Sequence, residues 1–93
     1  MRSVKFQGHI ESEICRLVEA PDDRIDVKAA IVFTLKNGAE AGEFTGRQTP
    51  LPVYAAKLFG TSTCPPLTFY YCFTESLAVV VAIKITQPDE QGD

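Results

Sequence analysis

The residues best suited to catalysis lie close together near the start of the chain: His9, Glu11, Glu13 and Cys15. A thiol beside an imidazole or a carboxylate is typical of an activated nucleophile. If this segment is helical, Glu11 and Cys15 share one face, but His9 lies at the frayed start of the helix. We therefore interpret these residues as a solvated helix face with one buried thiol, and we predict no catalytic residue.

The sequence does not indicate a metal site. His9 is the only histidine, which excludes a site built from several histidine ligands. The acidic residues of the first third lack the Asp-x-Asp-x-Asp-Gly spacing of calcium loops and are interpreted as ordinary surface charge; they are Glu11, Glu13, Glu19, Asp22, Asp23 and Asp26. We expect neither a metal nor a cofactor.

An anion contact has one weak candidate. The glycine spacing over residues 42–46 fits neither of the common phosphate-binding loops. Arg47, Gln48 and Thr49 follow directly, near the start of an expected helix, where backbone N–H groups favour anions. We name these three residues and His9 as the candidate ligand-binding residues, with an exposed capping loop as the alternative interpretation.

Length and composition limit the class of protein. The 93 residues predict a single domain, 1–93, in which a ligand site is expected on the surface or at a subunit junction. The net charge of −3 argues against a general nucleic-acid binder. The N-terminus has no signal-peptide pattern, and the longest apolar run, Leu77 to Ile83, is far too short to span a membrane. We therefore expect no membrane association.

The cysteines indicate a reducing compartment. Cys15, Cys64 and Cys72 are an odd number and include no C-x-x-C pair, so free thiols and a cytoplasmic location are expected. Cys64 lies in a loop that contains two prolines, and we predict that it is the exposed and fast-reacting thiol.

Periodicity in the first half predicts four elements. Ser3 to Gln7 alternates like a short strand, and residues 10–19 carry apolar side chains at helical spacing, with a strand as the poorer alternative. Residues 25–36 show the cleanest alternation in the chain and are followed by Asn37-Gly38, a strong hairpin signal. A strand over 25–36 and a second strand over 39–45 are therefore predicted.

The second half predicts a helix and a second hairpin. Thr49 and Pro50 favour a helix start, so a helix is expected over 49–59. Residues 67–74 and 77–86 are rich in aromatic and β-branched side chains and predict a hairpin. A three-residue loop would place Phe73 opposite Leu77 and gather the bulky side chains on one face. The polar tail, 88–93, is expected to be frayed.

The predicted fold class is α+β: an antiparallel sheet of about five strands with two short helices, in the order β-α-β-β-α-β-β. The first six elements match a ferredoxin-like order with one strand added. This order has one difficulty, because it places the most apolar strand of the chain at a sheet edge.

These features favour a non-enzymatic protein-interaction module that works as a homo-oligomer, most simply a dimer, and that could also bind another protein. One alternative is a small-molecule or anion-binding protein, or a small enzyme, with its site at a subunit junction. Another is an acidic regulator that docks on a basic partner. The predicted interface is the less bulky face of the sheet and comprises Tyr70, Ala78, Val80, Ala82 and Val32.

Overall fold

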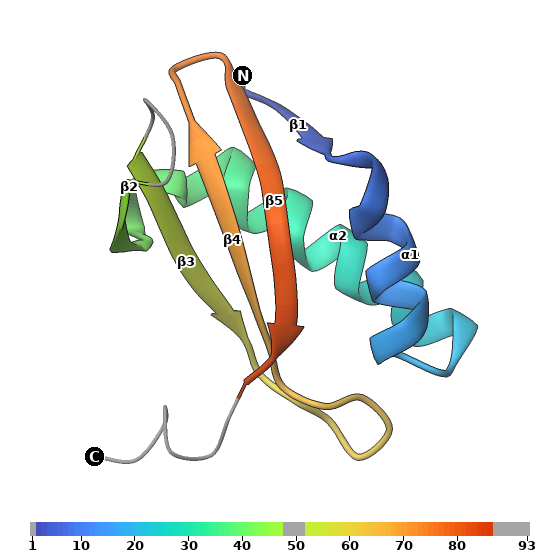
Figure 1. The fold of residues 1–93 in the computed structure, drawn as a ribbon. Helices are drawn as coiled ribbons and strands as arrows, with labels where there is room; N and C mark the ends of the chain where they lie inside the picture. Colours follow the sequence, from blue (N-terminus) through green and yellow to red (C-terminus); the bar gives the residue numbers. More distant parts are fainter. Residues whose placement is uncertain (1, 48–51, 87–93) are drawn as a thin grey trace.

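The computed structural model describes residues 2–47 and 52–86, and within them it shows a two-layer α+β fold (Figure 1). A five-stranded sheet forms one layer, and two helices lie together on one of its faces. The elements in chain order are β1 (Ser3–Phe6), α1 (Gly8–Leu17), α2 (Pro21–Gly38), the 3₁₀ turn η1 (Ala39–Ala41), β2 (Glu43–Arg47), β3 (Pro52–Leu58), β4 (Leu67–Phe73) and β5 (Leu77–Ile85).

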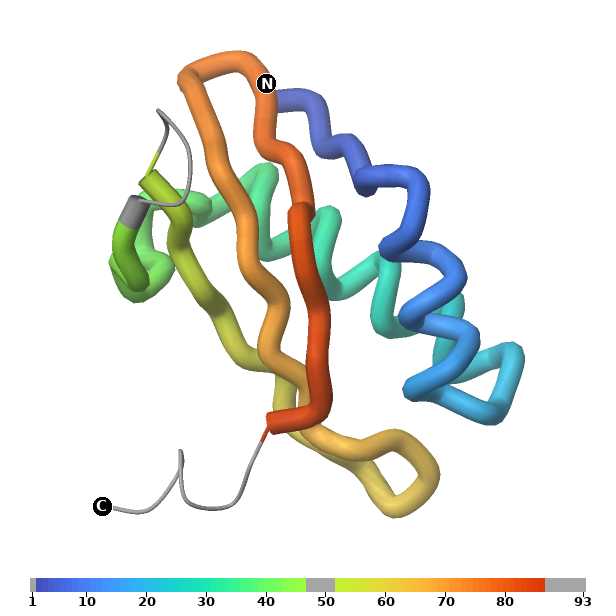
Figure 2. Tube along the Cα trace, in the orientation of Figure 1, coloured from blue at the N-terminus to red at the C-terminus, as the bar shows by residue number. Residues whose placement is uncertain are grey.

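The α+β class with five strands is confirmed, but the sheet is mixed. The strand order is β1-β5-β4-β3-β2, and β1 runs parallel to β5, whereas the other neighbours are antiparallel. The ferredoxin-like order is not found, because both helices precede β2. The apolar β5 lies between β1 and β4, so the difficulty of an apolar edge strand disappears (Figure 2).

Two N-terminal predictions are confirmed. The strand predicted from Ser3 is β1, and the helix predicted over 10–19 is α1. Ile10 and Ile14 are buried one helical turn apart, and Val18 directly after the helix is buried as well. The amphipathic pattern therefore identified both the element and its buried face.

The strand predicted over 25–36 is wrong, because this segment lies in the 18-residue helix α2. Pro21 and two aspartates occupy its first turn, where a missing N–H and negative charge are favourable. Successive alternate residues lie on opposite sides of a helix, about 200° apart. Alternation along a helix therefore produces two apolar stripes on opposite sides. The stripe formed by Val27, Ile31 and Leu35 is buried against the sheet.

The structure also differs from the predicted hairpin turn at Asn37-Gly38 and from the predicted helix over 49–59. Asn37-Gly38 forms the end of α2 instead of a hairpin turn, and β2 begins only at Glu43. Of the helix predicted over 49–59, residues 49–51 lie outside the described residues, and most of the rest forms β3. Within β3, Tyr54, Ala56 and Leu58 face the helices, which is the alternation of a strand.

The hairpin predicted over 67–86 is confirmed as β4 and β5, but its register is wrong. Phe73 lies opposite Ala78 instead of Leu77. The backbone N–H of Thr74 donates to the Leu77 carbonyl at 2.7 Å, so Thr74 and Leu77 close a two-residue loop, one residue shorter than predicted. This shift exchanges the two faces of the first half of β5.

A bulge at Val81 exchanges the faces again. The adjacent residues Tyr70 and Tyr71 pair with Ala82 and Val80, which leaves Val81 without an opposite residue. The side chains of β5 that are buried beneath the helices are accordingly Ala78, Val80 and Ile83.

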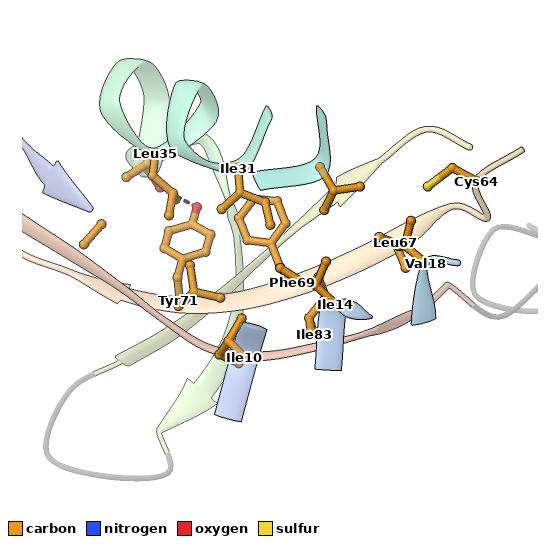
Figure 3. Close-up of a cluster of buried hydrophobic side chains, with 14 residues drawn as sticks. Ile10, Ile14, Val18, Ile31, Leu35, Cys64, Leu67, Phe69, Tyr71 and Ile83 are labelled. Atoms are coloured by element: carbon orange, nitrogen blue, oxygen red, sulfur yellow. Dashed lines mark hydrogen bonds between the residues drawn. The ribbon is translucent and has the colours of Figure 1, made fainter. Parts of the chain in front are cut away.

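The core lies between the helices and β4 (Figure 3). Phe69 and Tyr71 of β4 point toward Ile31 and Leu35 of α2. The Tyr71 hydroxyl donates to the Ala39 carbonyl at 2.6 Å, which satisfies the only polar atom of this buried ring. The core is therefore mainly aliphatic, and Phe69 and Tyr71 are its two largest side chains.

Candidate functional site

The predicted ligand-binding residues are not brought together. His9 lies in α1, with Nε2 3.2 Å from the carbonyl oxygen of Val81. The backbone of Arg47 ends β2, which is the opposite edge of the sheet from β1. Gln48 and Thr49 lie outside the described residues. The backbone of Arg47 therefore lies at the far edge of the sheet from β1, the strand that precedes the helix of His9.

The acidic groups near His9 pair with different basic residues. Glu11 accepts a hydrogen bond from Lys28 Nζ at 3.1 Å, and Glu13 accepts one from Arg16 at 2.6 Å. The bond from Arg16, together with its charge, lowers the pKa of the Glu13 carboxyl. Among residues 2–47 and 52–86, no group of three or more His, Cys, Asp or Glu side chains could hold a metal ion.

The first of two apolar surfaces is the open sheet face, which lies away from both helices (Figure 1). Its register places Tyr70 and Ala82 side by side. Lys84, which lies on β5 with Ala82, has its Nζ 5.8 Å from the centre of the Tyr70 ring on β4. We define the open sheet face by its partly exposed apolar residues Tyr70, Cys72, Leu77, Val79 and Ala82; Val53 and Ala55 on the same side of β3 are buried.

The predicted interface residues divide between the two layers. Tyr70 and Ala82 lie on the open sheet face. Ala78 and Val80 are fully buried beneath the helices, so they are not surface residues of the chain. Val32 lies on α2 and is half-buried. The shifted register and the helical α2 are the physical reasons for these differences.

The second apolar surface is the outer α2 face, formed by the stripe that alternation leaves on the far side of the helix. Ile25 is 67% exposed and Phe33 is 70% exposed, while Ala29 between them is also exposed. Apolar residues on both sides of a helix are typical of a helix covered on both sides. Among the described elements, nothing forms a third layer over α2 (Figure 1).

A hollow of about 390 Å³ lies where the end of α2 meets β3. Thr34, Glu43, Lys57 and Tyr71 contribute its polar groups, and alanines and glycines form much of the rest. Burial and the nearby charge of Glu40 raise the pKa of the Tyr71 phenol, so it stays protonated and remains a donor. The hollow is large enough for a small ligand but has few polar groups directed at one point.

No family model, curated protein or solved structure matches the chain. Of the described helices, neither has the length and apolar character needed to cross a membrane. The geometry of the two apolar surfaces is therefore the basis for the function proposed below. Sequence reasoning missed the outer α2 face, although its signal was the alternation over residues 25–36.

The reactivity of the thiols differs from the sequence prediction. Cys15 is exposed and Cys64 is buried, so the prediction that Cys64 is the exposed thiol is wrong. The Cys64 backbone N–H donates to Thr61 Oγ1 at 3.1 Å, and this loop turns the thiol inward. Burial raises the pKa of the Cys64 and Cys72 thiols, which lowers their thiolate fractions at neutral pH.

We predict that Cys15 reacts first with a thiol reagent. Titration of the native protein at neutral pH should show one fast thiol, which Cys15→Ser removes. The two slower thiols should accelerate as the pH rises, because more thiolate then forms. Cys64→Ser is the matched control and should retain the fast phase. A fast phase that survives Cys15→Ser would contradict the structure.

Proposed function

We propose that the protein is a non-enzymatic protein-interaction module that acts as a homo-oligomer, most simply a two-fold dimer. The observation that supports this proposal is that the outer α2 face exposes Ile25 and Phe33, while the open sheet face carries partly exposed apolar side chains. Soluble monomers rarely leave apolar patches larger than a few hundred Å² in water. A second copy on one surface and another protein on the other would cover both.

We also propose a cytoplasmic location, which is supported by three cysteines that form no disulfide.

The experiment that tests self-association is sedimentation of the wild type at micromolar concentration. We expect a species of twice the 10.2 kDa mass of one chain, with dissociation on dilution. The far-ultraviolet circular dichroism of the same samples serves as the control for folding. A folded species that sediments at 10.2 kDa over the whole concentration range would overturn the proposal.

A ligand-binding function is the second candidate, and the hollow beside Tyr71 is the observation that favours it. A ligand that binds the folded state alone raises the melting temperature in proportion to the logarithm of its concentration. A screen of small metabolites and inorganic anions by thermal shift therefore separates the two functions. A concentration-dependent rise that Thr34→Leu removes would favour ligand binding at the hollow.

A further inference from the structure

Five exposed residues of α2 have a symmetric order along the helix. Ala29 is at the centre, Ile25 lies four residues before it, and Phe33 lies four residues after it. Asp22 lies seven residues before Ala29, and Lys36 lies seven residues after it. All five are exposed, and at 100° per residue they occupy one narrow strip of the helix surface.

This order is self-complementary when two copies of α2 run antiparallel and cross at Ala29. Residues equally distant from the crossing point then face each other, so Ile25 of each copy faces the partner's Phe33. Asp22 of each copy faces the partner's Lys36, and two opposite-charge pairs form at the two ends of the contact. A parallel arrangement would instead place each charged residue opposite its own copy, which is repulsive.

We propose that the chain dimerises through an antiparallel, two-fold contact between the outer faces of α2. This inference rests on the homo-oligomer proposed above and names the surface that forms it. It leaves the open sheet face available for a different protein. A two-fold contact of this kind uses the same surface on both copies, as the symmetric order requires.

The dimensions of α2 are compatible with such a contact. Asp22 and Lys36 are separated by about 21 Å along the helix, at 1.5 Å per residue. Pairs at both ends form when the helices cross at a shallow angle of about 20°, the angle usual for helix bundles. The small side chain of Ala29 at the crossing point allows the axes to approach to about 8 Å.

The charges of this face are available for a partner. None of the ion pairs Arg2–Glu40, Arg16–Glu13 and Lys28–Glu11 includes Asp22 or Lys36. The two residues belong to the first turn and the last turn of α2. Antiparallel pairing therefore brings the positive end of one helix dipole near the negative end of the other.

Charge exchange between copies provides the sharpest test. Asp22→Lys alone gives two Lys–Lys pairs in the dimer, and Lys36→Asp alone gives two Asp–Asp pairs. At low salt, each variant should self-associate roughly tenfold more weakly than the wild type, because surface pairs contribute modestly. An equimolar mixture of the two variants should form a heterodimer with wild-type affinity, since both of its pairs are again opposite in charge.

The apolar part of the contact is tested by Phe33→Asp, with Val79→Asp on the open sheet face as the matched control. Phe33 is 70% exposed, so its substitution should leave the monomer folded, as circular dichroism will show. We expect Phe33→Asp to sediment as a monomer at micromolar concentration and Val79→Asp to remain a dimer. The double variant Asp22→Lys/Lys36→Asp should also remain a dimer.

The outcomes separate this inference from the function on which it rests. Rescue in the mixture, together with a monomeric Phe33→Asp, would support the α2 contact. A dimeric wild type that Val79→Asp dissociates and Phe33→Asp does not would overturn the α2 contact and leave the homo-oligomer intact. A monomeric wild type would overturn both.

Discussion

Val80→Asp is expected to cause the largest loss of stability. Val80 is fully buried beneath the helices, within a cluster of apolar side chains. An aspartate there loses the burial of the valine side chain and places an unpaired carboxylate among apolar groups. We expect a loss of at least about 4 kcal/mol in the free energy of unfolding, against about 5–15 kcal/mol for a typical domain.

The adjacent residue provides the control for this prediction. Val79 is partly exposed on the open sheet face, so Val79→Asp introduces the same charge without burying it beneath the helices. Urea denaturation followed by circular dichroism measures both variants. A Val80→Asp protein as stable as Val79→Asp would show that the register of β4 against β5 is wrong.

Gly42→Ala is expected to cause the second largest loss of stability. A methyl group on Gly42 would overlap the hydroxyl and ring of Tyr71, and it would lie 3.2 Å from the Ala55 carbonyl oxygen. Tyr71 cannot retreat easily, because it is fully buried and its hydroxyl is bonded to the Ala39 carbonyl. We expect the free energy of unfolding to fall by about 3 kcal/mol, as for severe overpacking.

Two further variants make this test specific. Gly8→Ala is the matched control, because its methyl group would have no neighbour within 4 Å, and it should unfold like the wild type. Tyr71→Phe removes the hydroxyl, so Gly42→Ala should cost less in that background than in the wild type. Equal costs in the two backgrounds, measured in urea, would contradict the close approach of Gly42 to Tyr71.

The elements with a clear apolar period were predictable, and the exceptions have identifiable causes. Residues 10–19 and 67–86 each fit one period, and both predictions are confirmed. The alternation over residues 25–36 was misread because a helix with two opposite apolar stripes has the same pattern as a strand. Long-range packing of α2 against the sheet decides between them, and local sequence does not record that packing.

The candidate site was less predictable than the fold. His9 and Arg47 were grouped by chemistry alone, and the sheet order places their elements at opposite edges. Tyr70 and Ala82 were assigned to an open face correctly, although the register used to select them was wrong. The bulge at Val81 explains this result, because it returns the second half of β5 to the predicted faces.

Because β1 pairs with β5, β1 leaves the ribosome well before its partner strand has been made. Until β4 and β5 are made, the inner stripe of α2 has no sheet to cover it. Translation at roughly 5–20 residues per second leaves this stripe exposed for several seconds. Nascent chains that carry α1 and α2 but not yet the sheet are therefore the most prone to aggregate and to bind chaperones.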